Sequence, residues 1–353
     1  MKSNLLNSNF LERAVGLLQS ARQQVVQQVN LIMVHTYFEI GRMIIEEEQG
    51  GEKRAGYGKG LLKELSNVLT QEFGKGFSVD NLEKMRKFYR TYGKSETLSR
   101  ISKKTITKTQ NHFRWRDLEQ TTFKLSWSHY ITLMRMEDEN ERSFYEIEAA
   151  KNNWSIRELK RQYNSALYTR LTLSRDKKQV KKLAKKGLVI ESAKDAIKDP
   201  YVLEFIGLPE QTSYSENELE QAIINKLEMF LLELGTGFTF VARQKRISFE
   251  GKHFYIDLVF FNRILNCFVL IDLKIGELKH QDLGQIQMYV NYYDRKIKLE
   301  SEHKTIGIIL CQDKNEAVVK YTLPENEKQI FASKYKTVLP SKKDLKHLIK
   351  EVG

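Results

Sequence analysis

Two aspartates and a lysine interrupt apolar runs in the C-terminal half of the chain. Asp257 lies within 255–259, Asp272 lies within 270–274, and the residues beside them are largely apolar. A buried carboxylate is costly unless it is paired with a cation or coordinates a metal. Two carboxylates and a backbone carbonyl form a hard-oxygen site that suits Mg²⁺ and a substrate phosphate. Lys274 is then placed to orient or deprotonate an attacking water and to stabilise developing charge.

The elements that carry these residues must bring them to one face of a sheet. Side chains two positions apart in a strand point to the same side, so Asp272 and Lys274 are expected to share a face. If the two strands are hairpin neighbours, Asp257 converges on that face as well. The tripeptide Asp-x-Lys is common by chance, and its other interpretation is an ion pair at a strand end. Its place in consecutive buried strands favours the metal site.

From about residue 212 onward, the apolar pattern predicts the element order α-β-β-β-α-β. The apolar runs are typical of strands that are covered on both faces. Helices are expected at 216–234 and 281–293, strands at 238–247, 254–261, 267–274 and 305–311, and turns at 250–251 and 263–266. We therefore predict an α/β domain over residues 211–353.

Residues 10–170 are predicted to be mostly helical, because apolar residues recur there at helical intervals. Two units are helix-turn-helix-like. The first is a helix at 61–73, a Gly-Lys-Gly turn and a helix opened by Ser78; the second is a helix at 139–151, a turn at 152–153 and a helix opened by Ser155. Residues 93–124 are polar and basic with little periodicity, and we expect a loop there. Residues 1–175 thus form the predicted helical domain.

The segment 176–210 is expected to connect the two domains. Paired lysines alternate with apolar residues in 176–186, which predicts a basic helix ended by Gly187. A solvated linker helix is the simplest role for it. A further helix is expected to start at Asp199-Pro200, with Asp199 as N-cap, and to end at Gly207.

Charge is unevenly divided along the 353 residues. Residues 1–200 hold 37 Lys and Arg against 24 Asp and Glu, a net charge of +13, whereas residues 201–353 hold 21 of each. A basic half of this kind indicates a polyanionic partner, either nucleic acid or an anionic surface, unless the lysines only solvate helices. The 41% hydrophobic content excludes wholesale disorder, and the length suggests about two domains.

The helix opened by Ser78 carries apolar residues at steps of three and four and basic residues on its other faces. The second unit repeats this pattern after Trp154. Helix, turn and basic helix are typical of DNA-binding units, whose phosphate contacts make affinity salt-dependent; the alternative is a helical bundle with a solvated basic face. The residues expected to contact nucleic acid are Lys84, Arg86, Lys87, Arg90, Arg157, Lys160 and Arg161.

The cysteines and the apolar runs indicate the cellular compartment in which the protein is expected. Cys267 and Cys311 are the two cysteines, which excludes a disulfide framework and a Cys-rich zinc site. Residues 1–30 show no signal-peptide core, and no apolar run reaches the roughly 20 residues of a membrane span. We expect a cytoplasmic protein without a membrane partner.

Short sequence blocks spread over nearly the whole chain are similar to those of a known family. They include Phe38-Glu39-Ile40-Gly41-Arg42, Phe73-Gly74-Lys75-Gly76-Phe77-Ser78, Trp154-Ser155-Ile156-Arg157-Glu158-Leu159, Lys198-Asp199-Pro200-Tyr201, Phe254-Tyr255-Ile256-Asp257-Leu258 and Lys274-Ile275-Gly276-Glu277. Together with an acid in one strand and Asp-x-Lys in the next, they resemble the YhcG-like group of the PD-(D/E)XK nuclease superfamily.

This resemblance implies an α+β chain: a helical N-terminal domain and a restriction-endonuclease-like αβββαβ domain. It implies hydrolysis of DNA phosphodiesters with Mg²⁺ or Mn²⁺, leaving a 5′-phosphate. By position, Asp257 and Asp272 match the metal-binding acids and Lys274 matches the catalytic lysine. Glu220 matches the auxiliary acid, and Gln285 matches a polar residue placed near the metal or the scissile phosphate.

Some positions depart from the family pattern or compete for a role. Ile256 replaces the proline of the superfamily name, and Asp272 stands where glutamate is expected, so a shorter side chain would alter metal geometry. Glu218 and Glu228 compete with Glu220 for the auxiliary role. Gln244 and Glu277 could also support the site by contacting its metal ligands. The simpler interpretation is that Gln244 is an amide at a strand edge and that Glu277 is a surface charge.

Three functions remain open from the sequence. A DNA nuclease is favoured, and the alternatives are an RNA nuclease and a non-catalytic DNA-binding or complex-forming protein on a nuclease-like scaffold. Cutting both strands of a duplex with one metal site per chain favours a homo-oligomer. The resemblance also suggests association with genome-defence or mobile-element proteins.

Overall fold

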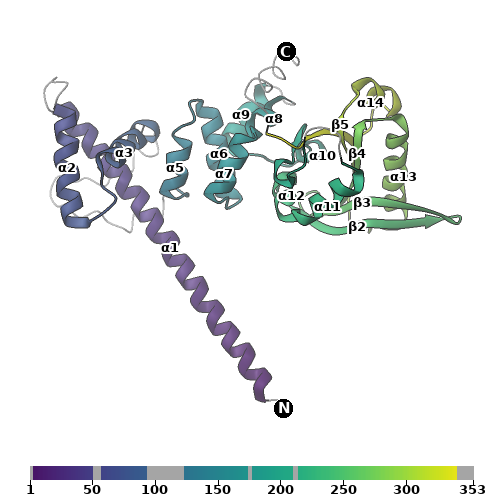
Figure 1. The fold of residues 1–353 in the computed structure, drawn as a ribbon, viewed down its shortest axis with the longest axis horizontal. Helices are drawn as coiled ribbons and strands as arrows, with labels where there is room; N and C mark the ends of the chain where they lie inside the picture. The colour runs from purple at the N-terminus through teal and green to yellow at the C-terminus, as the bar shows by residue number, and fades with distance from the viewer. Residues whose placement is uncertain (1–2, 51–56, 94–122, 174–176, 210–213, 340–353) are drawn as a thin grey trace. The chain divides into compact units, whose positions relative to one another are not determined.

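The computed structural model describes residues 3–50, 57–93, 123–173, 177–209 and 214–339 (Figure 1). The chain divides into two compact units, Met1–Ile156 and Arg157–Gly353. The helices that follow Ile156 therefore group with the sheet, although the sequence suggested a helical domain over 1–175. The functional limits 1–175, 176–210 and 211–353 stay a prediction.

Helices build the first unit. They are α1 (Ser3–Gly50), α2 (Tyr57–Phe73), α3 (Val79–Tyr92), α5 (Trp127–Leu133) and α6 (Glu139–Lys151). The helix start predicted at Ser78 is confirmed, because the Ser78 hydroxyl accepts a hydrogen bond from the Asn81 N–H at 3.3 Å. Most of the loop expected at 93–124 lies outside the described residues.

An aromatic cluster forms the centre of this unit. The ring centroid of Phe88 on α3 lies 4.9 Å from that of Phe123, 5.0 Å from that of Tyr130 and 5.6 Å from that of Phe38 on α1. All four side chains are buried. Edge-on and tilted contacts at these distances are favourable for aromatic rings. The cluster fixes the C-terminal half of α1 against α3.

Gly41 allows the close approach of α1 to α3. A Cβ at this position would lie 2.1 Å from the Met85 carbonyl oxygen. We expect Gly41→Ala to lower the free energy of unfolding by about 1–3 kcal/mol, because the two helices must move apart. Gly16→Ala is the matched control: it lies on the same helix with nothing within 4 Å, and we expect a gain of up to about 1 kcal/mol. Urea unfolding of both variants measures the difference, and equal stabilities would contradict the close packing.

A six-stranded mixed sheet organises the second unit. Its strand order is β1-β6-β5-β4-β3-β2, with β2, β3 and β4 antiparallel and β4, β5, β6 and β1 parallel. The strands are β1 (Tyr201–Val202), β2 (Phe238–Phe249), β3 (Lys252–Asn262), β4 (Cys267–Glu277), β5 (Ile306–Asp313) and β6 (Ile330–Lys336). The turn predicted at 250–251 is confirmed, since Glu250 and Gly251 have φ of 51° and 76°.

Helices cover both faces of this sheet. The helices of the unit are α7 (Ile156–Asn164), α8 (Leu167–Leu173), α9 (Lys177–Lys186), α10 (Ala193–Ala196), α11 (Glu216–Asn225), α12 (Leu227–Leu234), α13 (His280–Lys296) and α14 (Glu316–Thr322). One core contains Leu258 and Phe260 with residues of α11 and α12, and the other contains Val259 and Leu270 with residues of α13. The predicted order α-β-β-β-α-β and the two-sided burial are confirmed.

The helix predicted to start at Asp199 is wrong. The Asp199–Pro200 peptide bond is cis, and the two residues after it form β1, which pairs in parallel with β6. Tyr201 and Val202 are fully buried there, so burial in the sheet outweighs the local helix signal. A 3₁₀ turn (Glu204–Ile206) follows. The basic helix that was predicted before Gly187 is present as α9.

Two smaller differences concern the sheet and its first helix. The sequence missed β6 as well as β1, because Ala332, Ser333 and the flanking lysines weaken its strand pattern. The helix expected over 216–234 is interrupted at Lys226, whose φ and ψ are −123° and 32°. Among the described residues, no helix is long and apolar enough to cross a membrane.

Candidate active site

Strands β3 and β4 bring the two aspartates side by side. Leu258 pairs with Ile271 across these antiparallel strands, and Asp257 and Asp272 are the next residues along. The Leu273 N–H donates to Asp257 Oδ2 at 2.7 Å, which fixes the Asp257 carboxylate against β4. The predicted hairpin neighbourhood of the two strands is therefore confirmed.

Lys274 and Asp272 share one face of β4, as the two-residue spacing predicted. Lys274 Nζ lies 3.0 Å from Asp272 Oδ2, and Asp272 is only 1% exposed. Glu216, at the start of α11, lies on the other side of the lysine, with its Oε2 3.8 Å from Nζ. The sequence did not single out Glu216. Its carboxylate also accepts a hydrogen bond from the Ile275 N–H at 3.3 Å.

Gln244 joins the helix to the strands. Its side-chain Nε2 donates to a Glu220 carboxylate oxygen and, at 3.0 Å, to Asp257 Oδ1. Gln244 has a φ of 44°, and it follows a bulge in β2 between Phe240 and Ala242. Bulges re-aim side chains beside functional sites. The Gln244 side chain thus links Glu220 to the site. From the sequence, Gln244 was expected to be only an amide at a strand edge.

The competing acids lie elsewhere. Glu218 caps α11 by accepting hydrogen bonds from the N–H (2.7 Å) and hydroxyl (2.9 Å) of Ser215. Glu228 is exposed on α12, and Glu277 is exposed and accepts a hydrogen bond from Asn315. Glu220 is 4% exposed, and its Oε1 lies 3.2 Å from Arg243 Nε.

Gln285 contacts the site indirectly. Its Nε2 donates to the Tyr289 hydroxyl at 2.6 Å, and that hydroxyl donates to the Tyr255 carbonyl at 2.9 Å. Gln285 and Tyr289 are four residues apart on α13, a spacing that places them on one helix face. Tyr289 was not predicted from the sequence, although its four-residue spacing from Gln285 could have indicated that the two side chains meet.

Burial and mutual repulsion perturb the acids. Burial raises the pKa of Asp272 to about 7, and the neighbouring Asp257 adds to the rise. Burial also raises the pKa of Asp257. For Lys274, burial alone would lower the pKa, but Asp272 outweighs it and the pKa rises to about 12. Lys274 is therefore a cation at neutral pH, beside two acids whose shared negative charge a second cation would relieve.

This donor set fits a divalent hard cation. Within the described residues, no group of three or more His, Cys, Asp and Glu side chains is arranged to hold a metal, so the two aspartates are a pair. In that same part of the chain, the buried oxygens Asp272 Oδ2 and Glu220 Oε1 have no hydrogen-bond partner beyond their ion pairs with Lys274 and Arg243. Mg²⁺ commonly binds through one or two carboxylates, keeping waters and substrate phosphates as its other ligands.

The expected nucleic-acid contacts on α3 differ in their surroundings. Lys84 lies 2.5 Å from Asp80 on its own helix, and Arg86 and Arg90 lie 2.5 Å and 3.5 Å from Glu48 on α1. The last member of this group is exposed: Lys87. Lys84, Lys87 and Arg90 therefore remain accessible, whereas Arg86 mainly joins two helices.

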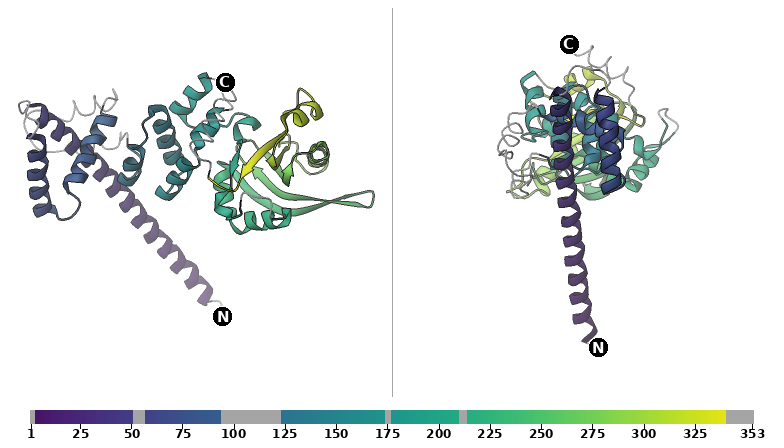
Figure 2. Two further views of the ribbon diagram at one scale, coloured as in Figure 1. Left: turned by 45° about the horizontal axis from the view of Figure 1, so that its top comes forward. Right: turned by 90° about the vertical axis from the view of Figure 1, so that its left-hand side faces the viewer.

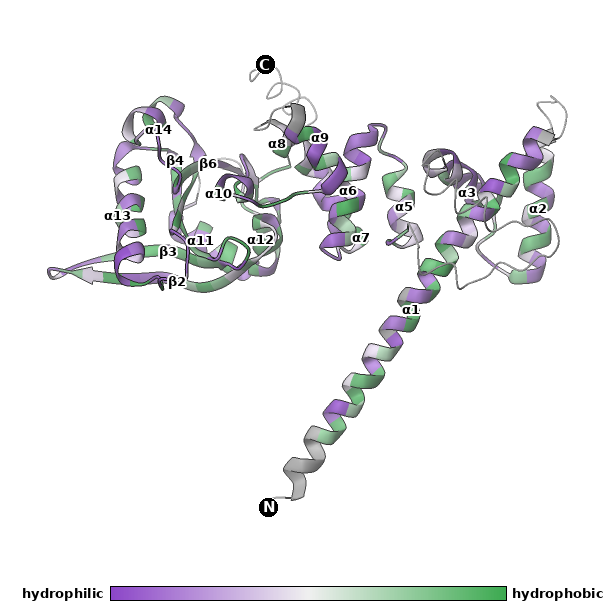
Figure 3. Cartoon of the chain, turned by 180° about the vertical axis from the view of Figure 1, so that it is seen from behind, coloured by the Kyte–Doolittle hydropathy of each residue, from purple (hydrophilic) through white to green (hydrophobic). Residues whose placement is uncertain are grey.

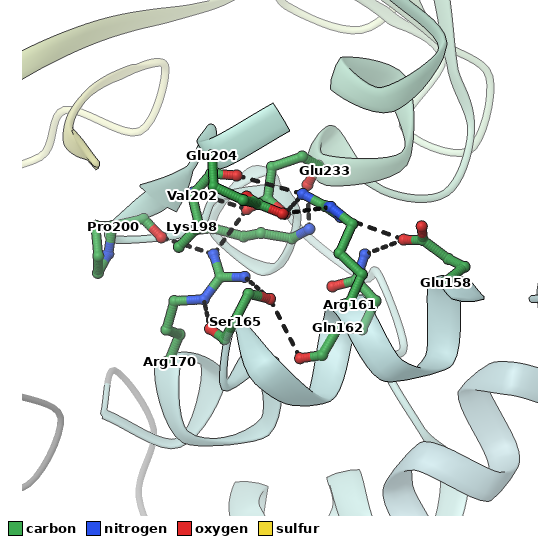
Figure 4. A network of polar contacts seen from close by, with 10 residues as sticks. All are labelled: Glu158, Arg161, Gln162, Ser165, Arg170, Lys198, Pro200, Val202, Glu204 and Glu233. Carbon is green, nitrogen blue, oxygen red and sulfur yellow. Dashed lines mark hydrogen bonds and ion pairs between the residues drawn. The ribbon is translucent and has the colours of Figure 1, made fainter. Parts of the chain in front are cut away.

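The expected contacts on α7 separate into two groups. Arg157 and Lys160 are exposed, whereas Arg161 is 10% exposed and lies within 3.2 Å of carboxylates on Glu158, Glu204 and Glu233. Figure 4 shows Arg161 directed into this network. Arg161 is therefore poorly placed for a phosphate contact, because three carboxylates already neutralise its guanidinium.

Glu233 is the centre of this network (Figure 4), which the sequence did not reveal. Its carboxylate lies 2.7 Å from Arg170 and 3.2 Å from Arg161, and it accepts the Val202 N–H at 3.1 Å. The buried Lys198 ammonium donates to the Glu233 carbonyl. The network thereby fastens α7 and α8 to α12 and β1.

Comparison with known proteins gives two family matches and one long relative. Residues 194–350 match the model of the YhcG PDDEXK nuclease domain, and residues 13–170 match that of the DUF1016 N-terminal domain. A relative from Escherichia coli (strain K12), named "Putative nuclease YhcG", is 38% identical over 340 residues, which are 94% of this chain and 90% of the relative.

Solved structures align over part of the chain. A repair endonuclease from Pyrococcus abyssi aligns with a TM-score of 0.26 and 20% identity, over 38% of this chain and 50% of its own. A complex of EndoMS with dsDNA2 aligns with a TM-score of 0.27 and 17% identity, over 38% of this chain and 49% of its own. Scores this low carry no argument about activity.

Proposed function

Because the chain belongs to the YhcG family, with its PDDEXK nuclease domain and DUF1016 N-terminal domain, we propose that it is a metal-dependent nuclease that hydrolyses phosphodiester bonds in DNA. The observation that carries the proposal is the grouping of Asp257, Asp272 and Lys274 beside one another on the neighbouring strands β3 and β4. Gln244 ties Glu220 to the same group.

Asp257 and Asp272 would hold the cation, Mg²⁺ or Mn²⁺. Bound there, it would polarise the scissile phosphate and neutralise developing negative charge. Gln244 holds the Asp257 carboxylate in position from one side, and the Leu273 N–H holds it from the other. Such supporting contacts orient metal ligands and tune their affinity.

Lys274 supplies the remaining positive charge. Its pKa of about 12 keeps it protonated at neutral pH, so it donates a hydrogen bond to the attacking water or to a phosphate oxygen rather than removing a proton. Its ammonium is preorganised by Asp272 at 3.0 Å. Preorganised donors aimed at developing charge are a major source of rate acceleration.

Basic side chains near the site support a nucleic-acid substrate. The β2–β3 hairpin carries exposed Lys245 and Arg246 directly after Gln244, and exposed Lys252 near its turn. Residues 201–353 have no net charge, but this hairpin is locally basic. In our proposal, the exposed basic residues of α3 and α7 add phosphate contacts through the helical N-terminal region.

Cleavage assays with the full chain test the proposal. End-labelled duplex DNA, single-stranded DNA and RNA are incubated with Mg²⁺, Mn²⁺ or EDTA, and DNA binding is measured separately in EDTA by fluorescence anisotropy. We expect DNA cleavage with Mg²⁺ or Mn²⁺ and none with EDTA. DNA binding without cleavage under any cation would favour the non-catalytic scaffold, and cleavage of RNA alone would make the chain an RNA nuclease.

Gln244→Ala is expected to lower the cleavage rate about 10–100-fold, because Asp257 and Glu220 lose the amide that joins them. Gln221→Ala is the matched control, since Gln221 accepts a hydrogen bond from the neighbouring Arg243 but touches neither acid in the described chain. Initial rates at several Mg²⁺ concentrations measure the effect, and saturating Mg²⁺ should restore part of it. Equal cleavage rates in the two variants would show that Gln244 does not support the active site.

A further inference from the structure

The N-terminal part of α1 exposes large apolar side chains that no other described element covers. Figure 2 shows this part of the helix extending beyond α2 and α3, and Figure 3 shows hydrophobic residues continuing along it. From Val34 onward, the same helix buries residues such as Phe38 against α3. The exposed residues, each between 51% and 73% accessible, are Phe10, Leu11, Val15, Leu17, Leu18, Val25, Val26 and Val29.

These residues follow the spacing of a coiled-coil seam. Positions 11, 15, 18, 22, 25, 29 and 32 alternate in steps of four and three, and all are apolar except Arg22. Such a 3.5-residue period places one stripe along the helix and requires a partner helix with matching spacing. Val26 lies beside the stripe and widens it, whereas Phe10 and Leu17 lie farther round the helix.

We propose that the partner is the same segment of a second copy of this chain, in antiparallel orientation. Antiparallel pairing centred on residue 20 sets Leu11 against Val29, Val15 against Val25, and Leu18 against Arg22 of the other copy. Parallel pairing in register would set Arg22 against Arg22 inside the seam, where two like charges repel. Beside Leu18, the Arg22 stem packs and its guanidinium reaches solvent.

The size and charge of the segment suit such a pair. Its 20 residues span about 30 Å, and the six exposed apolar side chains on or beside the stripe offer roughly 500–600 Å² of apolar surface per copy. A pair would therefore bury roughly 1,000–1,200 Å² in total, which is the lower end of the range for specific protein interfaces. Residues 10–29 hold only Glu12, Arg13 and Arg22 as charged groups, so two copies do not repel strongly.

Sedimentation equilibrium of the full chain tests the pairing. The wild type is expected to have twice the 41.4 kDa chain mass at micromolar concentration, and Val25→Glu is expected to halve it. Ser20→Glu adds the same charge on the opposite side of the helix and should leave the dimer intact, and circular dichroism checks that both variants stay folded. A monomeric wild type, or a dimer that survives Val25→Glu, would overturn the proposal.

Disulfide cross-linking tests the orientation. A chain with both Leu11→Cys and Val29→Cys should form a covalent dimer on oxidation, whereas Leu11→Cys alone should not. The native Cys267 and Cys311 are buried, which keeps background cross-linking low. Efficient dimerisation of Leu11→Cys alone would overturn the antiparallel arrangement.

Discussion

Replacing Lys274 by alanine is expected to lower the rate of metal-dependent DNA cleavage by about 10³-fold, while DNA binding stays close to that of the wild type. Lys274 Nζ lies 3.0 Å from Asp272 and is charged at neutral pH. Its loss removes the preorganised cation of the site but none of the exposed basic residues that we assign to binding. Single-turnover cleavage and anisotropy in EDTA measure the two effects separately.

Two further variants make the Lys274 result specific. Lys304→Ala removes an exposed lysine just before β5, and it should cleave at the wild-type rate. Asp257→Ala should abolish cleavage, and unlike Lys274→Ala it should also weaken the binding of Mn²⁺, which calorimetry detects. Unchanged cleavage in Lys274→Ala would show that the enzyme uses another site.

Glu233→Ala is expected to lower the free energy of unfolding of the second unit by about 3–5 kcal/mol. The substitution leaves the buried Arg170 without its carboxylate partner and removes one of the three carboxylates around Arg161. Lys198 keeps its hydrogen bond to the carbonyl of residue 233 but loses the neighbouring negative charge. Glu191→Ala is the control, because Glu191 pairs with Lys182 at the exposed surface and should cost less than about 1 kcal/mol. Urea unfolding followed by circular dichroism and by hydrogen exchange of peptides from residues 157–353 compares them, because that unit contains no tryptophan. Equal losses would contradict the central role of Glu233.

The same carboxylate predicts a pH dependence. Burial alone would raise the pKa of Glu233, but Arg170 and Lys198 outweigh it and lower the pKa to about 2, against an ordinary value of 4.5. Its stabilising contribution is therefore complete above about pH 4.5 and is lost as the pH falls toward 2. The stability difference between wild type and Glu233→Gln should shrink by about 3 kcal/mol over that range. A difference independent of pH would contradict the lowered pKa.

The ion-pair network around Glu233 also connects the two segments of the chain that match different family models. Arg161 and Arg170 lie within the segment that matches the DUF1016 N-terminal domain, whereas Lys198 and Glu233 lie within the nuclease-domain match. Glu233 binds partners from both segments. We therefore expect a fragment that begins at residue 194 to be less stable than the full chain, because Glu233 would lose Arg161 and Arg170.

The sequence by itself determined the order α-β-β-β-α-β in the middle of the sheet region, without β1 and β6, and the grouping of Asp257, Asp272 and Lys274 there. Alternating and continuous apolar runs specify strands locally, and the two-residue period places Asp272 and Lys274 on one face without any distant contact. A carboxylate within a buried strand is costly, which singled out Asp257 and Asp272. These inferences needed only neighbouring residues.

Only the tertiary structure decided which distant residues complete the site and the core. Gln244 reaches Glu220 across 24 residues, and Arg161 reaches Glu233 across 72. It also decided that Tyr201 and Val202 join a strand instead of a helix, because their partners in β6 lie more than 130 residues away. Periodicity constrains a side chain relative to its own helix or strand, whereas the partner it meets depends on how those elements pack.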